Sequence, residues 1–248
     1  YTTLFRSAGL PLWQIWGLDR TAIKPISVTI GISSPQDAKK RVRNWLEFID
    51  VKMLKVKLGS PDGIEADIKM LDAVKQEAPT LDLYVDANGG WSLEDAQQMS
   101  FILADMGVKY IEKPLIRGQE EKLVELKKLS PIPIFVDESC FTSADIPHLA
   151  ECADGVNIKL MKSGGLTEAI RMINTARSCG LQVMFGCYSD STLANTALAQ
   201  LAPLADYLDL DSHLNLIDDP FRGALIEEGK ILPNNLPGLG VQRSAFAA

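Results

Sequence analysis

Residues 81–106 read LDLYVDANGGWSLEDAQQMSFILADM, a short apolar run, a glycine-containing turn and a longer amphipathic segment. The first six residues end at Asp86 and have the length and composition of a buried strand. Residues 93–106 repeat apolar side chains at helical spacing, and Ser92 directly before them suits a helix N-cap. The stretch therefore predicts one strand followed by one helix, the unit from which parallel sheets are assembled.

The same unit recurs on both sides of this stretch, with strands spaced roughly 23–28 residues apart. Amphipathic segments lie at residues 35–49, 63–76 and 166–179, and Gly180 suits a helix stop after the last of them. Eight such units favour a closed α/β barrel of the (β/α)8 TIM type over an open sheet. The expected strands are residues 26–32, 52–57, 81–86, 108–113, 132–137, 155–159, 182–185 and 205–209.

The two ends of the chain depart from this pattern. Residues 1–20 read as a short helical segment with a break at Gly9-Leu10-Pro11, before the barrel that we expect over residues 21–220. Residues 221–248 form a C-terminal segment, in which residues 221–242 show an apolar, hairpin-like pattern with Glu228-Gly229-Lys230 at its turn. We expect both ends to pack against something outside the barrel.

Composition and charge argue against several classes of protein. The 248 residues, 46% hydrophobic and 23% charged, can bury one large core and remain soluble. The net charge of −7 argues against nucleic-acid binding, which needs a basic face. No apolar run approaches the roughly 18 residues that a membrane span needs. The four cysteines form no CxxC pair and the chain has two histidines, so we expect a reduced, cytoplasmic protein without a histidine-rich metal site.

Three acidic residues, Asp86, Glu112 and Asp137, lie at the ends of neighbouring predicted strands. In a barrel, the carboxyl ends of the strands form the face that carries the active site. Three carboxylates that converge there repel one another unless a cation lies between them. Oxygen ligands with open positions suit Mg²⁺, so we expect these side chains to hold one Mg²⁺ ion per active site.

Lys57 and Lys159 end the second and sixth predicted strands, which lie opposite each other in a ring of eight. Two opposed amines can remove a proton from one face of a carbon and return it to the other, which inverts the centre. A base must be neutral, and we expect the neighbouring Lys55 and the metal to lower the pKa of these lysines. Lys162 competes with Lys159 for the role, but Lys159 fits the strand register better, so we expect Lys162 to cap or solvate the loop.

Asp209 and Asp211 end the eighth predicted strand, opposite Glu112 on the fourth. They suit the ammonium group of a substrate whose carboxylate binds Mg²⁺ at the other side of the cavity. The carbon next to that carboxylate then lies between the two lysines, and Mg²⁺ stabilises the enediolate that forms when its proton leaves. These residues predict a Mg²⁺-dependent isomerase that performs a 1,1-proton transfer.

Five motifs resemble those of the enolase superfamily, in its muconate-lactonizing subgroup. They are KVK at residues 55–57, DANGGW at 86–91, IEKP at 111–114, VDES at 136–139 and NIKLMKSGG at 157–165. The DLD sequence at 209–211 is similar to the DxD of the dipeptide epimerases in that subgroup, which include the L-Ala-D/L-Glu epimerases. The resemblance implies a dipeptide substrate, Lys57 and Lys159 as the two bases, and substrate contacts by Lys55, Thr29 and Cys187.

The resemblance also has a limit at the N-terminus. The family places an α+β capping domain before the barrel, and only its last helix has a counterpart here, GLPLWQIWG at residues 9–17. We therefore expect most of the capping domain to be missing, with remnants of it at both ends of the chain. At the seventh strand, GCYSDS places Asp190 where the group often has Glu.

Several less specific interpretations stay open. Strand-end carboxylates often cap helices or pair with surface lysines, and aspartates such as Asp209 are frequent where loops begin. Gly164-Gly165 suits a tight turn, and His213 suits a solvated loop. Alternative functions are an o-succinylbenzoate synthase or cycloisomerase of the same superfamily, a Schiff-base aldolase that uses the strand-six lysine, and a non-catalytic barrel. The paired aspartates favour a dipeptide epimerase, and a homo-oligomer is compatible with every reading.

Overall fold

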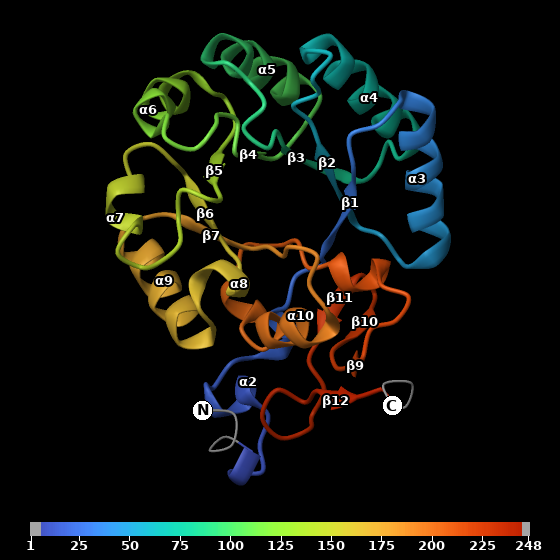
Figure 1. Cartoon of the computed structure of the whole chain (residues 1–248), viewed down its shortest axis with the longest axis vertical. Coiled ribbons are helices and arrows are strands. Elements are labelled where there is room, and N and C mark those ends of the chain that lie inside the picture. The colour runs from blue at the N-terminus through green and yellow to red at the C-terminus, as the bar shows by residue number, and fades with distance from the viewer. Residues whose placement is uncertain (1–5, 245–248) are drawn as a thin grey trace.

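The computed structural model describes residues 6–244 and shows a ring of strands surrounded by helices (Figure 1). Eight parallel strands pair in chain order from β1 to β8, which confirms the predicted (β/α)8 TIM-type barrel. Each strand lies within the residue range predicted for it. The strands are β1 (Ser27–Ile30), β2 (Met53–Lys57), β3 (Asp82–Asp86), β4 (Ile111–Glu112), β5 (Ile134–Val136), β6 (Gly155–Ile158), β7 (Gln182–Phe185) and β8 (Tyr207–Leu208).

The helices follow the strands along the chain and lie around the ring (Figure 1). The longest ones agree with the predicted amphipathic segments to within one residue at each end. The helices of the barrel are α3 (Pro35–Phe48), α4 (Ile64–Glu77), α5 (Leu93–Asp105), α6 (Glu120–Leu129), α7 (Ile146–Leu149), α8 (Leu160–Ser163), α9 (Leu166–Ser178) and α10 (Thr192–Ala199). Within residues 6–244, short 3₁₀ segments lie before β1, η1 (Arg20–Ala22), and on either side of β8, η2 (Ala202–Leu204) and η3 (Ser212–Asn215).

Local sequence sets where the helices begin. Ser92 forms a capping box at the start of α5: its hydroxyl accepts a hydrogen bond from the backbone N–H of Asp95, whose carboxylate accepts one from the N–H of Ser92. Ser34 caps α3 in a similar way, because its side chain accepts the N–H of Asp37. Such side chains satisfy N–H groups that the first turn of a helix leaves without partners.

Each strand presents one set of side chains to the helices and another to the barrel interior. On β2, Leu54 and Val56 are fully buried against the helices, whereas Lys55 and Lys57 point into the barrel. This alternation follows from the two-residue period of a strand. The alternation explains why a strand with a buried apolar face can also carry lysines that point into the barrel.

The lower part of the barrel interior is filled by a cluster of large side chains, Tyr84, Tyr110, Phe135 and Met184. The rings of Tyr84 and Tyr110 stack with their centroids 4.7 Å apart. Gly155 on β6 is required here, because a Cβ at this position would lie 2.1 Å from the ring of Phe135. The interior is therefore packed below and polar above, which leaves the carboxyl ends of the strands as the place for chemistry.

Side chains complete the ring between β1 and β8, and the described residues form no backbone ladder between these two strands. The hydroxyl of Ser27 donates a hydrogen bond to Asp209 Oδ1 at 3.0 Å, and the backbone N–H of Thr29 donates one to Asp211 Oδ2 at 2.7 Å. The two aspartates at the end of β8 thus satisfy groups on β1 that a neighbouring strand would otherwise satisfy.

Helix α2 (Leu12–Ile15) and strand β12 (Gln242–Arg243), near the two ends of the described residues, lie outside the ring (Figure 1). The short helix α2 contacts the C-terminal part, where the N–H of Leu12 donates to the carbonyl of Gly238 at 3.0 Å. Strands β10 (Leu225–Glu227) and β11 (Lys230–Leu232) pair as an antiparallel hairpin, which confirms the predicted turn. Strand β9 (Phe221–Arg222) pairs with β12. The division into capping-domain remnants and a barrel stays a prediction.

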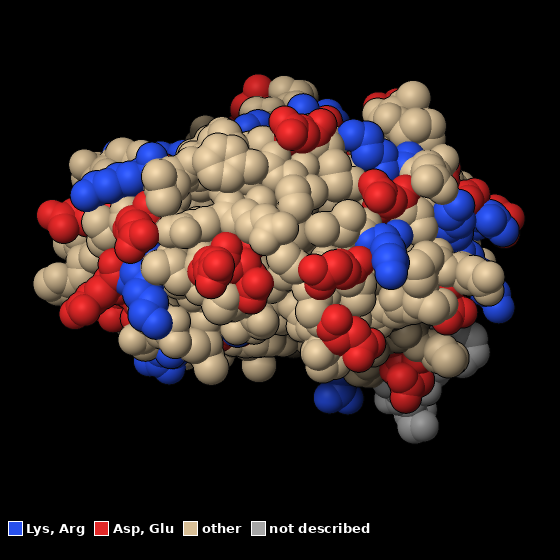
Figure 2. All heavy atoms as spheres, turned by 90° about the horizontal axis from the view of Figure 1, so that it is seen from above, with Lys and Arg blue, Asp and Glu red and all other residues tan. Residues whose placement is uncertain are grey.

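Acidic and basic side chains are interspersed over the face of the molecule seen in Figure 2. Within residues 6–244, no helix has the length and apolar character that a membrane crossing requires.

Candidate active site

A cavity of about 700 Å³ opens among the carboxyl ends of the strands. It is bordered by residues that follow β3, β5, β6, β7 and β8, together with side chains of β1 and β2. Six of the residues predicted for the site line it, namely Thr29, Lys57, Lys159, Cys187, Asp209 and Asp211. The other four, Lys55, Asp86, Glu112 and Asp137, are buried around its base.

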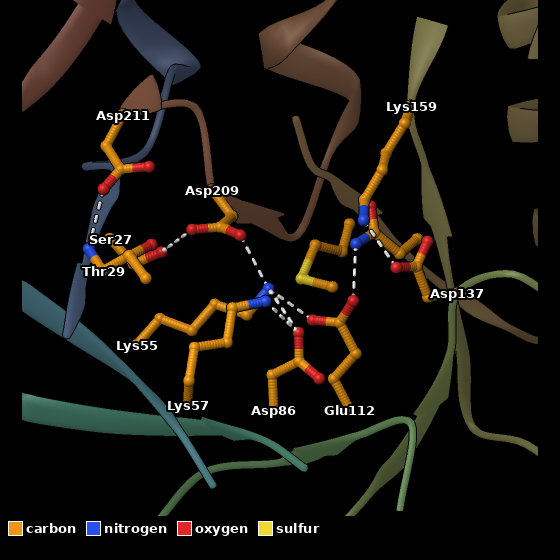
Figure 3. Close-up of polar contacts among 12 residues, drawn as sticks. Ser27, Thr29, Lys55, Lys57, Asp86, Glu112, Asp137, Lys159, Asp209 and Asp211 are labelled. Atoms are coloured by element: carbon orange, nitrogen blue, oxygen red, sulfur yellow. Dashed lines mark hydrogen bonds and ion pairs between the residues drawn. The ribbon is translucent and has the colours of Figure 1, made fainter. Parts of the chain in front are cut away.

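Lys57 and Lys159 approach the cavity from opposite sides (Figure 3). Lys57 lies at the end of β2 and its Nζ is 2.5 Å from Asp86 Oδ2. Lys159 directly follows β6 and its Nζ is 2.5 Å from Asp137 Oδ2. Each lysine is therefore paired with the carboxylate at the end of a nearby strand.

The environment of Lys159 differs from the expectation that its pKa is lowered. Burial lowers the pKa of this amine, but the carboxylates of Asp137 and Glu112 outweigh burial and leave the pKa above its ordinary value. The ring of Tyr188 lies 4.6 Å from Lys159 Nζ, where its electron-rich face also favours the charged form. The structure thus holds Lys159 as an ammonium group.

The three carboxylates predicted to bind metal influence one another. Burial, followed by the charges of Asp86 and Asp137, raises the pKa of Glu112 to about 7. Burial also acts on Asp86 and Asp137, but neighbouring lysines outweigh it and hold the pKa of both below the ordinary value. The mutual repulsion at Glu112 is what a cation among these groups would relieve.

Within residues 6–244, no three Asp, Glu, His or Cys side chains have the spacing of a metal site. Each carboxylate instead faces a lysine, as Figure 3 shows for Asp86, Glu112 and Asp137. The donor set nevertheless fits Mg²⁺ in kind, because it offers three buried oxygen ligands at adjacent strand ends and a repulsion that favours a cation. Metal binding by these side chains requires Lys57 and Lys159 to leave the carboxylates.

Lys55 lies in the middle of the barrel and is 1% exposed. Its Nζ is 2.6 Å from Asp209 Oδ2 and 3.7 Å from Asp86 Oδ2, and it also pairs with Glu112. Burial lowers the pKa of Lys55, but these three carboxylates outweigh it and raise the pKa well above the ordinary value. The structure places Lys55 as a counter-ion below the cavity, and its expected contact with substrate stays a prediction.

Asp209 and Asp211 both reach the cavity, and both also hold neighbouring residues. The two oxygens of Asp209 accept hydrogen bonds from Ser27 and Lys55. One oxygen of Asp211 accepts a hydrogen bond from the backbone N–H of Thr29. Burial, followed by the charge of Asp209, raises the pKa of Asp211 to about 6. This acidic pair has the charge and the position to receive a cationic group.

Cys187 lines the cavity between β7 and β8. Burial raises the pKa of its thiol to about 12, and the nearby Asp209 and Asp211 act in the same direction. This environment favours the neutral thiol of Cys187 at the border of the cavity and disfavours the reactive thiolate.

Lys162 was expected to cap or solvate the loop, and the structure shows it capping the loop after β5 and not exposed to solvent. Its side chain is buried, its Nζ lies 2.8 Å from Asp137 Oδ1, and it donates to the carbonyl of the same residue. The chain turns directly from β6 into α8, which brings Lys162 back beside Lys159. Gly164 and Gly165 both have positive φ after α8, as expected for a tight turn.

Asn157, Met161 and Tyr188 are among the residues of the site that were not singled out from the sequence. Asn157 is fully buried on β6 and donates to Glu112 Oε1 at 2.7 Å. It lies two residues before Lys159, so the period of the strand indicates that both point inward. Met161 and Tyr188 also line the cavity; they lie within the NIKLMKSGG and GCYSDS stretches, but no role was assigned to them from the sequence.

Comparison with known proteins places the chain in a family. The family described as "Enolase C-terminal domain-like" matches residues 37–246. The "Hydrophobic dipeptide epimerase" of Roseobacter litoralis is 50% identical over 237 residues, which cover 95% of this chain and 68% of the relative. The "L-Ala-D/L-Glu epimerase" of Bacteroides thetaiotaomicron is 34% identical over 236 residues, which cover 95% of this chain and 60% of the relative.

A solved structure agrees with these relatives. The dipeptide epimerase from Cytophaga hutchinsonii, in complex with Mg and the dipeptide D-Ala-L-Val, has a TM-score of 0.91 and 29% sequence identity. The similarity covers 99% of this chain and 68% of that chain. The chain belongs to the enolase C-terminal domain-like family, among relatives named as epimerases, and is an isomerase.

Proposed function

We propose that the chain is a dipeptide epimerase, which inverts the carbon next to the free carboxylate of a dipeptide by 1,1-proton transfer. The observation that carries the proposal is that Lys57 and Lys159 line one cavity from opposed strands of the barrel. Proton removal alone needs one amine, whereas inversion needs a proton donor on the opposite face. The names of the relatives and the ligands of the solved complex support a dipeptide as substrate.

The two lysines exchange roles with the direction of the reaction. In each direction, one must be neutral to take the proton and the other must be an ammonium group to return it. The ring of Tyr188, 4.6 Å from Lys159 Nζ, favours the charged form of Lys159, which suits this lysine to be the donor when Lys57 is the base. Because Asp137 would hold the metal in both directions, the contact of Lys159 with Asp137 is given up when the metal binds.

Asp86, Glu112 and Asp137 would hold one Mg²⁺ ion, which supplies positive charge where the substrate carboxylate becomes more negative as the proton leaves. The support for this assignment is the donor chemistry of the three side chains and the presence of Mg in the related complex. Asn157 and Lys55 both contact Glu112, so they orient its carboxylate.

The acidic pair would hold the ammonium group of the dipeptide. Asp211 has an oxygen that the Thr29 N–H does not use, and Asp209 lies beside it in the cavity lining. A substrate bound in this way spans the cavity from the ends of β3–β5 to the end of β8, which places its acidic carbon between the lysines.

The proposal is tested by incubating the protein with Mg²⁺ and L,L-dipeptides in D₂O, with mass and chirality measured at the C-terminal residue. We expect inversion with uptake of one deuterium, and its loss when EDTA removes the metal. In Lys57→Ala and Lys159→Ala, epimerisation should fall by at least roughly 10³-fold, because general acid–base steps contribute about this much. Each variant should still exchange the α-proton of one epimer, the one whose proton faces the remaining lysine.

Alternative functions give different results in the same assay. A cycloisomerase or o-succinylbenzoate synthase would leave the dipeptides unchanged and act on substrates without an amine. A Schiff-base aldolase would be trapped by borohydride at Lys159 and would be insensitive to EDTA. Full epimerase turnover by either alanine variant would contradict the two-base mechanism.

A further inference from the structure

We propose that Asp67 is a positioning residue for Lys57: its carboxylate fixes the loop that follows β2 and thereby holds the amine of Lys57 in line with the reacting carbon. The inference rests on the proposed function, because it concerns one of the two lysines that exchange the proton. Asp67 lies in the first turn of α4, outside the ring of strands, and does not line the cavity.

The carboxylate of Asp67 is buried and holds two loops together. The residue is 1% exposed. Its Oδ2 accepts the backbone N–H of Gly59 at 2.9 Å and the indole N–H of Trp91 at 2.8 Å, and its Oδ1 accepts the backbone N–H of Ser60 at 3.0 Å. A carboxylate is stable in a buried place only when its oxygens are hydrogen-bonded, so Asp67 and the loops after β2 and β3 stabilise one another.

Lys57 lies two residues before the first of these contacts. The pairing of β2 with β3 continues for one residue beyond it, since the N–H of Leu58 donates to the carbonyl of Asp86 at 2.8 Å. The chain then leaves the strand at Gly59, whose φ is +85°. The bonds of Asp67 to the N–H groups of Gly59 and Ser60 fix this turn, and with it the backbone from which the side chain of Lys57 extends.

The turn at Gly59 packs directly against the loop after β3, which carries the DANGGW motif. A Cβ at Gly59 would lie 2.2 Å from the carbonyl oxygen of Ala87, and a Cβ at Gly90 would lie 2.6 Å from the Cα of Gly59. No side chain fits between the two loops, so a displacement of one loop is transmitted to the other. The bond from Trp91 to Asp67 completes this contact and gives the last part of the motif a role in the site.

The two lysines differ in what else holds them. In the described part of the chain, Lys57 has one ion-pair partner, Asp86, and its side chain is 26% exposed. Metal binding would remove Asp86 from this amine and leave its position to the backbone. The side chain of Lys159 is 7% exposed, and the ring of Tyr188 lies 4.6 Å from its Nζ, a contact that metal binding does not remove. Loss of the Asp67 contacts should therefore displace Lys57 and leave Lys159 in place.

The test uses Asp67→Asn and the two epimers of one dipeptide. An amide has one acceptor oxygen and presents a donor where the other oxygen accepted an N–H, so it cannot keep all three bonds. The probes are L-Ala-L-Leu and L-Ala-D-Leu, or the same pair of the dipeptide with the highest rate in the assay above. The initial rate of deuterium uptake at the α-carbon is measured from each epimer in D₂O with Mg²⁺. Lys57→Ala identifies the epimer whose proton faces Lys57, because this variant no longer exchanges it.

We expect Asp67→Asn to slow deuterium uptake from the epimer that faces Lys57 by at least about tenfold, since misplacement of a reacting group by about 1 Å can cost roughly 100-fold. Uptake from the other epimer should change by less than about twofold, because Lys159 can return a deuteron to the face from which it took the proton. Lost stability or weaker metal binding would slow both epimers alike. The inequality therefore separates positioning of Lys57 from a merely structural role.

Asp145→Asn is the matched control. The carboxylate of Asp145 also fixes a loop at the carboxyl ends of the strands, the one after β5, by accepting the N–H groups of Phe141 and Thr142. This variant should not slow the epimer that faces Lys57 more than the other epimer.

Trp91→Phe is the second variant, because it removes the indole N–H and leaves the backbone bonds of Asp67 in place. It should slow the same epimer as Asp67→Asn, by at least about threefold, since a hydrogen bond to a charged group is lost. Circular dichroism checks that each variant is folded, and Trp91→Phe decides the matter if Asp67→Asn does not fold.

Amide hydrogen exchange gives a measurement that needs neither substrate nor metal. In EDTA, the amides of Gly59 and Ser60 should exchange faster in Asp67→Asn than in the unmodified protein, because they lose their acceptor. The amides of Phe141 and Thr142 should keep their rates in this variant and exchange faster in Asp145→Asn.

The outcomes separate this inference from the proposed function. If the unmodified protein takes up no deuterium from any dipeptide, the proposed function fails, and the role of Asp67 fails with it. If the unmodified protein exchanges both epimers but the Asp67 and Trp91 variants slow the two equally, or if the amides of the loop after β2 exchange no faster, the inference is overturned while the proposed function stands.

Discussion

The Nζ of Lys55 lies 2.6 Å from Oδ2 of Asp209, and this buried ion pair joins β2 to β8 past the intervening β1. The same amine also pairs with Glu112 and lies 3.7 Å from Asp86. Lys55 therefore faces three buried carboxylates, of which Asp86 also pairs with Lys57 at 2.5 Å. Removal of a single partner from such a group leaves the others with uncompensated charge, which costs more than the pair itself contributes.

Lys55→Met is expected to lower the free energy of unfolding by about 3–5 kcal/mol, the usual cost of a buried ion pair that loses one partner. Urea denaturation followed by circular dichroism measures this change. Lys109→Met is the control, since Lys109 pairs with Asp82 at 3.3 Å on the surface, where a change within about 0.5 kcal/mol is expected. Equal unfolding midpoints for the two variants would show that Lys55 is not a structural counter-ion.

Asp211→Asn is expected to weaken the binding of dipeptides with a free amine while the fold is preserved. The amide retains an oxygen for the N–H of Thr29, so the contact between β1 and β8 survives. The lost charge should raise KM by about tenfold or more, since a hydrogen bond to a charged group contributes about 1.5–3 kcal/mol. N-acetylated dipeptides provide the comparison because they have no ammonium group, and the variant should handle them like the unmodified protein.

The stability of the protein in EDTA is expected to fall as the pH rises through the range in which Glu112 titrates. The pKa of Glu112 is raised from 4.5 to about 7, by burial and then by the neighbouring acids. The folded state thus binds this proton more tightly than the unfolded chain, so its advantage is present at low pH and is lost as the pH rises from about 4.5 to about 7.

The contribution of Glu112 to this pH dependence is measured by urea denaturation at a series of pH values. The unmodified protein is compared with Glu112→Gln. The variant cannot titrate at this position and should show a smaller loss of stability over the same range. Mg²⁺ should reduce the loss in the unmodified protein, since a cation favours the ionised carboxylate. A stability that rises with pH more steeply in the unmodified protein than in the variant would contradict the assignment.

Cys187 is expected to resist alkylation in the folded protein near pH 8. Its thiol has a pKa of about 12, so the reactive thiolate is scarce at this pH. Iodoacetamide treatment followed by peptide mass spectrometry measures the modified fraction, and protein unfolded in urea provides the fully modified reference. Rapid modification of Cys187 in the folded state would show that the thiol is activated.

The positions of the strands were predictable because each is a short apolar run in a regular succession of strands and helices. At β4 and β8 the predicted strands are longer than the observed ones, which contain two residues each. Residues on both sides of these short strands still bond to the neighbouring strands: the N–H of Lys113 donates to the carbonyl of Phe135 at 2.8 Å, and the N–H of Asp209 donates to that of Phe185 at 2.8 Å. Helices α7 and α8 are four residues long, which is too short for an apolar period to be recognised.

The residues that form the site could largely be predicted from the sequence, but the side chains that each of them contacts could not. Strand ends and their order place the lysines and carboxylates at one end of the barrel. Whether Asp86 and Asp137 turn to a metal or to Lys57 and Lys159 depends on side-chain rotation, which sequence spacing does not determine. The burial of Lys162 beside Asp137 was not predicted because it depends on α8, a helix of four residues that the sequence pattern does not reveal.

The way the ring closes between β1 and β8 limits how the substrate range of the enzyme can be changed. The two aspartates that would bind the substrate amine also accept hydrogen bonds from Ser27 and Thr29. These bonds replace the backbone pairing that a neighbouring strand would give β1. Selection for amine-free substrates should therefore retain hydrogen-bond acceptors such as asparagine at both positions, since aliphatic replacements would free the β1 edge. A substitution at Asp209 or Asp211 therefore affects substrate selection and the contact between β1 and β8 at the same time.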